Sequence, residues 1–180
     1  LAQKGLTGSV LTIPEPLHAG NDVSYLSLLG FDPKKYYAAP AEFESLALGI
    51  ELETGQVPLC CDFVILQSGH TDMVMKDYTA NQLSTKDAEI LLHDLQEKIV
   101  DAQIKFYPGL GYHNLMVIES DFFSERLLPP DGLIGEGIRD RMPSSPVSKK
   151  LIFVMNQAQI ILHNHPYNKN RQAEGKDPIN

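Results

Sequence analysis

The chain has 180 residues, of which 15 are Lys or Arg and 23 are Asp or Glu, so its formal net charge at pH 7 is −8. This acidic balance argues against nucleic-acid binding, because a protein that holds a phosphate backbone needs a basic face and no run rich in Lys and Arg exists here. Hydrophobic residues at 43% and charged residues at 21% are ordinary for a globular protein, and the length allows one domain with an appended segment.

The first fifty residues predict one strand and two short helices. Residues 10–13 are an apolar run that ends in a Pro-Glu-Pro sequence, which indicates a strand followed by an extended loop. Asn21 is a plausible N-cap for a helix over residues 22–29. A proline and a glycine bracket a second helix over residues 41–48.

The middle of the chain predicts a hairpin followed by the strongest helix. Residues 57–66 and 71–76 have the character of strands around a short turn. Ser84 precedes the helix, and Asp87 three positions later makes an acidic variant of the capping box. Apolar residues recur on one face of this helix and should be buried: Ala88, Leu91, Leu92, Leu95, Ile99 and Ala102.

Two more strands and a second long helix follow. Residues 105–107 and 112–118 are the strands, and residues 119–145 form a loop rich in Pro and Gly with one helical turn near Ile138. Pro146 begins the last long helix. Its apolar stripe is Val147, Leu151, Val154, Ala158, Ile161 and Leu162. Residues 164–180 are largely polar, and we expect them to be exposed or to pack on something absent from this sequence.

The order from residue 57 to 164 is therefore β-β-α-β-β-α. Two helices with one apolar stripe each can cover one face of a sheet of about four strands, mixed or antiparallel, which predicts an α+β two-layer sandwich; a three-layer α/β fold is the alternative. We expect residues 1–50 to form an N-terminal segment, residues 51–165 the α+β domain and residues 166–180 a tail.

The sequence contains no membrane span and no signal of export. The nearest apolar stretch, residues 151–162, is shorter than the roughly 20 residues that a bilayer requires and contains amide side chains. The first residue is Leu, and no basic-then-apolar leader follows, so we expect a piece cut from a longer chain. Cys60 and Cys61 are adjacent in a predicted strand and should point to opposite faces without bonding to each other. A reducing cytoplasm is the simplest setting.

Short catalytic motifs are missing. There is no Gly-x-Ser-x-Gly sequence, no dinucleotide fingerprint and no Walker-type loop. Two cysteines do not make a zinc site, and the six histidines are scattered. His163 and His165 lie near a helix end, where a cationic role at the helix terminus is more ordinary than a metal pair. We name no metal-binding residue.

A linear pattern is more informative than any single motif. Its first part is Thr-Ile-Pro-Glu-Pro-Leu at residues 12–17, followed by Gly-Asn-Asp-Val-Ser-Tyr-Leu-Ser-Leu-Leu-Gly-Phe-Asp-Pro at residues 20–33. Further parts are Tyr36-Tyr37, Leu48-Gly49-Ile50, Asp77-Tyr78, Leu83-Ser84-Thr85, Phe106-Tyr107-Pro108-Gly109 and His-Pro-Tyr-Asn-Lys-Asn-Arg at residues 165–171. In this order and spacing the pattern resembles the archaeal-type cofactor-independent phosphoglycerate mutases.

The resemblance implies a metalloenzyme of the alkaline phosphatase superfamily. Such enzymes use two divalent metals, commonly Mn²⁺, Mg²⁺ or Zn²⁺, and a serine that is phosphorylated while phosphate moves between the 3- and 2-positions of glycerate. By the resemblance, this chain is largely the inserted domain that covers the substrate, and the metal ligands belong to a core outside these residues. Its implied partners are that core of the same parent chain and a small phosphorylated acid.

The resemblance also suggests the site residues. The nucleophilic serine of the family falls on Asn21, whose amide cannot accept and return a phosphoryl group. A helix cap explains this Asn adequately, and we favour that role. Substrate contacts are expected from Asp22, Asp62, His113 and Arg171. Several positions where the family places Arg or His carry other residues instead, among them Pro40, Cys60, Gln82 and His113. A phosphorylated acid is normally gripped by arginine forks, so these differences weaken the expected anion site.

Three functions remain open at this point. The first is the inserted domain of a phosphoglycerate-mutase-like enzyme in glycolysis, inactive as this fragment and with altered or absent chemistry in the parent. The second is a non-catalytic acidic module for protein interaction or ligand sensing. The third is another phosphotransferase, or a phosphonate or phosphate hydrolase, of the same superfamily.

Overall fold

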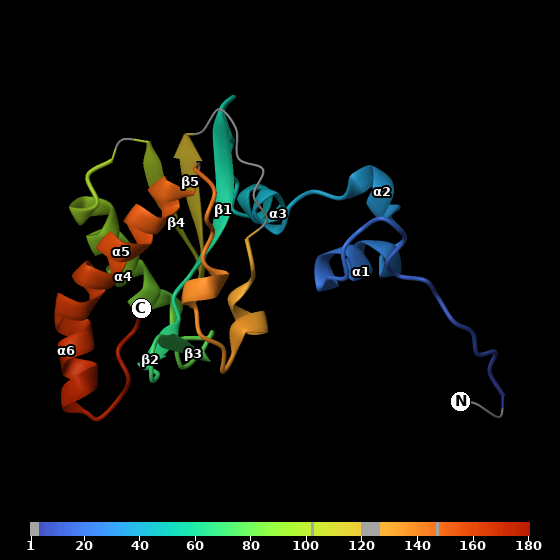
Figure 1. Ribbon diagram of the computed structural model, residues 1–180. Coiled ribbons are helices and arrows are strands. Elements are labelled where there is room, and N and C mark those ends of the chain that lie inside the picture. Colours follow the sequence, from blue (N-terminus) through green and yellow to red (C-terminus); the bar gives the residue numbers. More distant parts are fainter. Residues whose placement is uncertain (1–3, 102, 120–126, 147) are drawn as a thin grey trace. The chain divides into compact units, whose positions relative to one another are not determined.

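The computed structural model describes residues 4–101, 103–119, 127–146 and 148–180 of the chain (Figure 1). The chain divides into two compact units, residues 1–43 and 44–180. The division lies within a helix, ahead of the boundary expected at residue 50. Among the described residues no helix has the length and apolar character needed to cross a membrane.

The first unit contains α1 (Asn21–Leu28), α2 (Pro33–Tyr36) and the start of α3 (Pro40–Ala47). Residues 10–13 were expected to form a strand, but they have no regular secondary structure. The physical reason is that the carbonyl of Thr12 accepts a hydrogen bond of 2.6 Å from Ser27 Oγ on α1, and no strand in the described part of this unit offers a ladder.

The expected capping role of Asn21 is wrong. Asn21 is the first residue of α1, and Gly20, with an extended backbone, occupies the N-cap position. The described structure has no side-chain hydrogen bond that caps this helix. The helix therefore begins one residue earlier than the sequence suggested, and the Asn21 side chain is exposed.

The second unit has a three-stranded antiparallel sheet in the order β1-β5-β4. Its strands are β1 (Gln56–Asp62), β4 (Ile104–Leu110) and β5 (His113–Glu119), with β5 in the centre. A separate two-stranded antiparallel sheet is formed by β2 (Ile65–Ser68) and β3 (Met73–Asp77). The strands thus form two small sheets, whereas the sequence suggested one sheet of about four strands.

The predicted strand over residues 57–66 is divided because its middle pairs with other parts of the chain. The backbone N–H of Phe63 donates to the carbonyl of Tyr112, and Val64 exchanges two backbone hydrogen bonds of 2.8 and 2.9 Å with Asn180. The outer edge of β3 is covered by the loop after β5, through hydrogen bonds to Gly135, Glu136 and Ile138. This loop contains η1 (Pro130–Leu133) and η2 (Arg139–Arg141), so the helical turn expected near Ile138 is confirmed.

The two long helices, α4 (Thr85–Lys98) and α5 (Lys149–Asn164), share one hydrophobic core with the three-stranded sheet. The sheet contributes residues of one face to this core: Leu59, Ile104, Met116 and Ile118. The predicted apolar face of α4 is buried from Ala88 to Ile99, and Leu151, Val154 and Leu162 of α5 are buried as well. Ala102 and Val147 lie outside the described residues. The α+β class is confirmed.

The C-terminal segment was expected to be exposed or to pack on something absent from this sequence, but parts of it pack on its own unit. Residues 166–173 form α6 (Pro166–Ala173), and the chain then returns so that Ile179 enters the core with 1% of its surface exposed. The buried amide of Asn168 donates to the carbonyls of Leu162 and Ile179 and accepts from the N–H of Ile179. Ile179 and Asn168 therefore hold this mostly polar segment against the core.

Candidate functional site

Asp22 lies next to Asn21 at the start of α1 and is held by two neighbours in the same unit. Tyr37 donates its hydroxyl to Asp22 Oδ2 at 2.8 Å, and His18 Nε2 lies 3.3 Å from the same oxygen. Burial raises the pKa of Asp22, but the hydrogen bond from Tyr37, a backbone N–H and the nearby imidazole outweigh it, and the pKa lies below its ordinary value. A side chain at position 20 would collide with this carboxylate, so Gly20 permits the arrangement.

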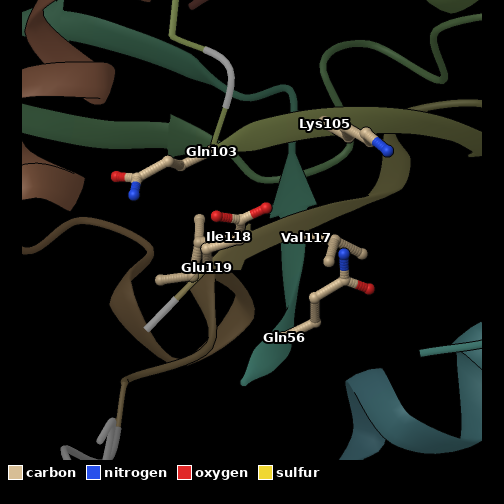
Figure 2. A pocket seen from close by; sticks show the side chains of 6 residues that line it. All are labelled: Gln56, Gln103, Lys105, Val117, Ile118 and Glu119. Carbon is tan, nitrogen blue, oxygen red and sulfur yellow. The ribbon is translucent and has the colours of Figure 1, made fainter. Parts of the chain in front are cut away.

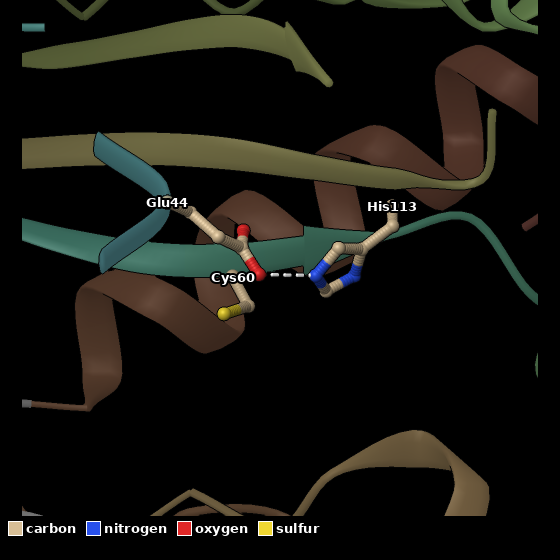
Figure 3. Close-up of side chains that lie close together, drawn as sticks. All are labelled: Glu44, Cys60 and His113. Atoms are coloured by element: carbon tan, nitrogen blue, oxygen red, sulfur yellow. Dashed lines mark hydrogen bonds and ion pairs between the residues drawn. The ribbon is translucent and has the colours of Figure 1, made fainter. Parts of the chain in front are cut away.

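A second cluster lies on the face of the three-stranded sheet that is turned away from the two long helices. Asp62 on β1 and His113 on β5 are direct cross-strand partners, and their side chains meet with Oδ1 and Nδ1 2.5 Å apart. The other ring nitrogen, Nε2, lies 2.5 Å from Oε1 of Glu44 on α3 (Figure 3). Cys60 precedes Asp62 by two residues in β1 and so points to the same face.

The electrostatics of this cluster are dominated by its carboxylates. The hydrogen bond to Asp62 and then that to Glu44 raise the pKa of His113 to about 10, although burial opposes them. Burial and the charges of Glu44 and Asp62 raise the pKa of the Cys60 thiol to about 12. Without a bound ion, the cluster therefore holds an imidazolium and a neutral thiol at pH 7, with two acidic side chains around the single cation.

Arg171 has a structural contact of its own. Its Nε donates to the carbonyl of Asp177 at 2.8 Å, which ties α6 to the C-terminal segment. The structure brings Asp62 and His113 together as a pair. Asn21 and Asp22 belong to the other compact unit. Of the four expected substrate contacts, Asp62 and His113 thus contact each other, while Asp22 and Arg171 each have other partners.

A shallow depression occupies the opposite end of the three-stranded sheet from Asp62 and His113 (Figure 2). It is lined by Gln56, Gln103, Lys105, Val117, Ile118 and Glu119. Among the described residues that line it, Lys105 is the only basic one, and Glu119 supplies a carboxylate. This depression does not offer the several cations that a phosphorylated acid needs.

Sequence reasoning missed Glu44 as part of a site, and it noted Cys60 only as a departure from the family pattern. The alternation of side chains along a strand places Cys60 on the face of Asp62, so that signal was present. Glu44 carries no comparable signal, because its approach to His113 depends on how the last turn of α3 lies against the sheet.

The fold and these clusters together define an α+β protein with small antiparallel sheets and an acid–imidazole cluster on the sheet face turned away from the long helices. The family model described as "2,3-bisphosphoglycerate-independent phosphoglycerate mutase" matches residues 2–168, and the chain belongs to this family. The resemblance found in the sequence motifs is confirmed.

Individual relatives agree with the family match. The chain is 33% identical over 180 residues to a probable 2,3-bisphosphoglycerate-independent phosphoglycerate mutase of Geobacter sulfurreducens, covering all of this chain and 45% of the relative. It is 32% identical to the corresponding enzyme of Methanosarcina barkeri, of which it covers 44%. A solved structure of the cofactor-independent phosphoglycerate mutase from Thermoplasma acidophilum aligns with a TM-score of 0.54 at 26% identity, over 89% of this chain and 44% of that one. The chain thus spans less than half the length of these relatives.

Proposed function

We propose that this chain is the substrate-covering domain of an enzyme similar to the mutases that interconvert 3- and 2-phosphoglycerate in glycolysis. We propose further that the chain is inactive by itself and that the parent enzyme has altered or absent chemistry. The observation that carries the proposal is the family match over residues 2–168 in a chain that covers less than half of each of these relatives. A cytoplasmic location, membership of the alkaline phosphatase superfamily and a metal-binding core in the same parent chain are parts of this proposal.

The described residues do not fit the two-metal centre that the proposal assigns to the core. A two-metal phosphoryl-transfer site needs several carboxylate and imidazole ligands around two closely spaced cations. The possible ligand groups in the described residues are two separate triads, Glu44 with Cys60 and His113, and His93 with Asp94 and Glu97. Neither triad can clamp two cations, so we derive no catalytic step through such a centre from this chain.

Position 21 supports the absence of catalysis by this chain. The nucleophile of the family aligns with Asn21, which lies exposed at the first residue of α1. A carboxamide nitrogen shares its lone pair with the carbonyl and does not become a nucleophile as a serine hydroxyl does. Asp22 beside it remains a carboxylate that Tyr37 and His18 orient, and we assign it a contact to a substrate hydroxyl.

The cluster around His113 supports a weakened grip on anions. Its imidazolium already donates to two carboxylates, so a phosphate oxygen has to displace Glu44 from Nε2 before it can use that proton. The acidic neighbours repel the incoming anion as well. We therefore assign Asp62 and His113 a positioning contact to a small phosphorylated acid, with Arg171 as a further substrate contact expected from the family motif.

A non-catalytic ligand-sensing or interaction module is the second candidate, and Asn21 is the observation that favours it. This candidate keeps the family fold but needs neither a nucleophile nor a metal core. It predicts that 3-phosphoglycerate causes no shift in the thermal stability of the chain.

The two candidates are separated by a chimera. This chain replaces the matching segment of the Geobacter sulfurreducens relative, and the formation of 2-phosphoglycerate from 3-phosphoglycerate is measured with Mn²⁺ present. We expect the chimera to be slower than the relative by about 10³-fold or more, as when nucleophiles are removed elsewhere. We expect Asn21→Ser in the chimera to restore a phosphoenzyme that mass spectrometry detects.

Circular dichroism of both chimeras provides the control for folding. Turnover by the Asn21 chimera at the rate of the relative would contradict the loss of catalysis. A folded Asn21→Ser chimera without phosphoenzyme or turnover would contradict the mutase-like assignment and favour the sensing module.

A further inference from the structure

Three side chains that can bind metal converge on the sheet face around His113. A carboxylate oxygen of Glu44, the sulfur of Cys60 and a ring nitrogen of His113 all lie within 4.8 Å of one another (Figure 3). All three residues belong to the unit formed by residues 44–180. They come from three different elements, α3, β1 and β5, so the convergence is a product of the tertiary structure.

The sheet positions two of these ligands by its register. Asp62 pairs with His113 across β1 and β5, and Cys60 lies two residues along β1 on the same face as Asp62. The imidazole therefore projects from the strand next to the one that carries the thiol. Glu44 comes down on the pair from α3, and its Oε1 lies 2.5 Å from Nε2 of His113.

Asp62 supplies the outer contact that metal-binding histidines usually have. Its Oδ1 lies 2.5 Å from Nδ1 of His113, so Nδ1 can keep its proton when Nε2, which faces Glu44, gives up its own to bind a metal. A carboxylate behind the imidazole fixes the ring orientation and makes Nε2 a better ligand. In protein metal sites such outer contacts change affinity by about 10- to 100-fold.

We propose that Glu44, Cys60 and His113 bind one Zn²⁺-class ion, with Asp62 orienting the imidazole and a fourth coordination position left to water or a small ligand. One sulfur, one nitrogen and one oxygen form a ligand set that suits Zn²⁺ and Co²⁺, whereas Mg²⁺ and Ca²⁺ prefer oxygen ligands alone. Binding forms three metal–ligand bonds and releases to solvent the proton of the Cys60 thiol and the proton that His113 shares with Glu44.

This site uses His113, whose Nε2 the proposed function assigns to the phosphorylated acid, so the ion and the acid compete for that nitrogen. Binding of the ion does not itself depend on mutase activity. The site holds a single ion on the sheet face, and it does not require the core that the mutase reaction needs. The other possible group, His93 with Asp94 and Glu97, lies along the surface of α4, and its Asp94 is already engaged by Lys98 and by His165. Because this group could also bind a metal ion, the experiment has to distinguish it from the site at His113.

The test is a titration of the 180-residue chain with Co²⁺, followed by absorption spectroscopy. We expect one equivalent to produce a thiolate-to-cobalt charge-transfer band in the near ultraviolet, together with the visible bands of a tetrahedral ion, and Zn²⁺ to displace it. Cys60→Ser removes the charge-transfer band. Cys61→Ser is the matched control, because the neighbouring thiol lies on the opposite face of β1, and it keeps the band.

Two further variants separate a built site from adventitious binding. Asp62→Asn keeps the charge-transfer band but weakens Co²⁺ affinity by about 10-fold or more, because the imidazole loses its orienting carboxylate. His93→Ala leaves both the band and the affinity unchanged. A chain that binds no Co²⁺, or that keeps the same spectrum in Cys60→Ser, overturns the proposal, and so does binding that His93→Ala abolishes.

Discussion

At the scale of single residues, Asp77 holds a turn in which three successive residues have positive φ. These are Ala80, Asn81 and Gln82, with φ values of 50°, 60° and 56°. Asp77 accepts hydrogen bonds from the N–H and the hydroxyl of Thr79 and from the N–H of Asn81. The left-handed conformation is unfavourable for residues other than Gly, but it places Ala80 fully inside the core.

We expect Asp77→Asn to lower the free energy of unfolding by about 1–3 kcal/mol at pH 7, because the amide keeps the shape but loses charge-assisted hydrogen bonds. Burial raises the pKa of Asp77, but the bonds from Thr79 and Asn81 outweigh it and bring the pKa below the ordinary 3.8. This stabilisation is fully present above pH 3.8 and is lost as the pH falls through the lower folded pKa. Urea unfolding from pH 7 to pH 2 measures it.

In that series the difference between wild type and Asp77→Asn should shrink toward acid pH. A difference that stays constant over the whole range would contradict a charge-dependent role for Asp77.

The strain in this turn is testable at Gln82, which is exposed and whose φ is 56°. We expect Gln82→Gly to raise the free energy of unfolding by about 0.5–1 kcal/mol. The strain energy removed from the left-handed backbone exceeds the cost of the greater conformational entropy that Gly has in the unfolded chain. Gln82→Val is the matched variant and should lower the free energy of unfolding by about 1–2 kcal/mol, because a β-branched side chain is excluded more strongly from this region. Thermal unfolding of both variants makes the comparison, and equal effects would rule out backbone strain.

At the scale of elements, α4 begins as its sequence predicts. Ser84 has an extended backbone, and its Oγ accepts a hydrogen bond of 3.2 Å from the N–H of Asp87. The same hydroxyl donates to the Asp87 carboxylate at 2.8 Å. Both interactions connect residues three apart in the chain, which is why the capping box could be recognised without a structure.

We expect Ser84→Ala to lower the free energy of unfolding by about 1 kcal/mol, the usual cost of a lost N-cap. Ser84→Thr, which keeps a hydroxyl, should lose less. Urea denaturation with helix content followed by circular dichroism measures both. An Ala variant as stable as wild type would show that the cap does not contribute to the stability of α4.

Strands are predicted less well than helices in this protein. The segments that form β1, β4 and β5 were all recognised as strands, yet β1 ends at Asp62 because Phe63 and Val64 pair with Tyr112 and Asn180. Strand pairing joins residues far apart in the sequence, so a local pattern does not reveal which strands become neighbours. Glu44 was missed beside His113 because this contact, too, joins residues far apart in the sequence.

At the scale of the whole molecule, the C-terminal segment completes the core of the second unit. Ile179 lies among the buried core residues, and Asn180 exchanges two backbone hydrogen bonds with Val64, which lies between β1 and β2. Asn168 is completely buried and makes the hydrogen bonds that hold Ile179 in place. The last residues are therefore structural parts of this unit.

We expect Ile179→Ala to lower the free energy of unfolding by about 2–5 kcal/mol, because it leaves a cavity in a packed core. Ile160→Ala on α5 is the matched control, since Ile160 is 58% exposed, and it should change stability by less than about 0.5 kcal/mol. Urea unfolding of both variants provides the comparison. An Ile179→Ala variant that matches the control would show that the C-terminal segment does not stabilise the core.

The sequence by itself determined the two long helices, their buried faces, the cap of α4 and the family, because each depends on residues close together in the chain or on a linear motif. It also located Asn21 and Asp22 at the start of α1. Only the tertiary structure decided the strand order β1-β5-β4, the burial of Ile179 and the meeting of Glu44, Cys60 and His113. These features depend on contacts between distant residues, whose free energy is gained only when the elements pack together.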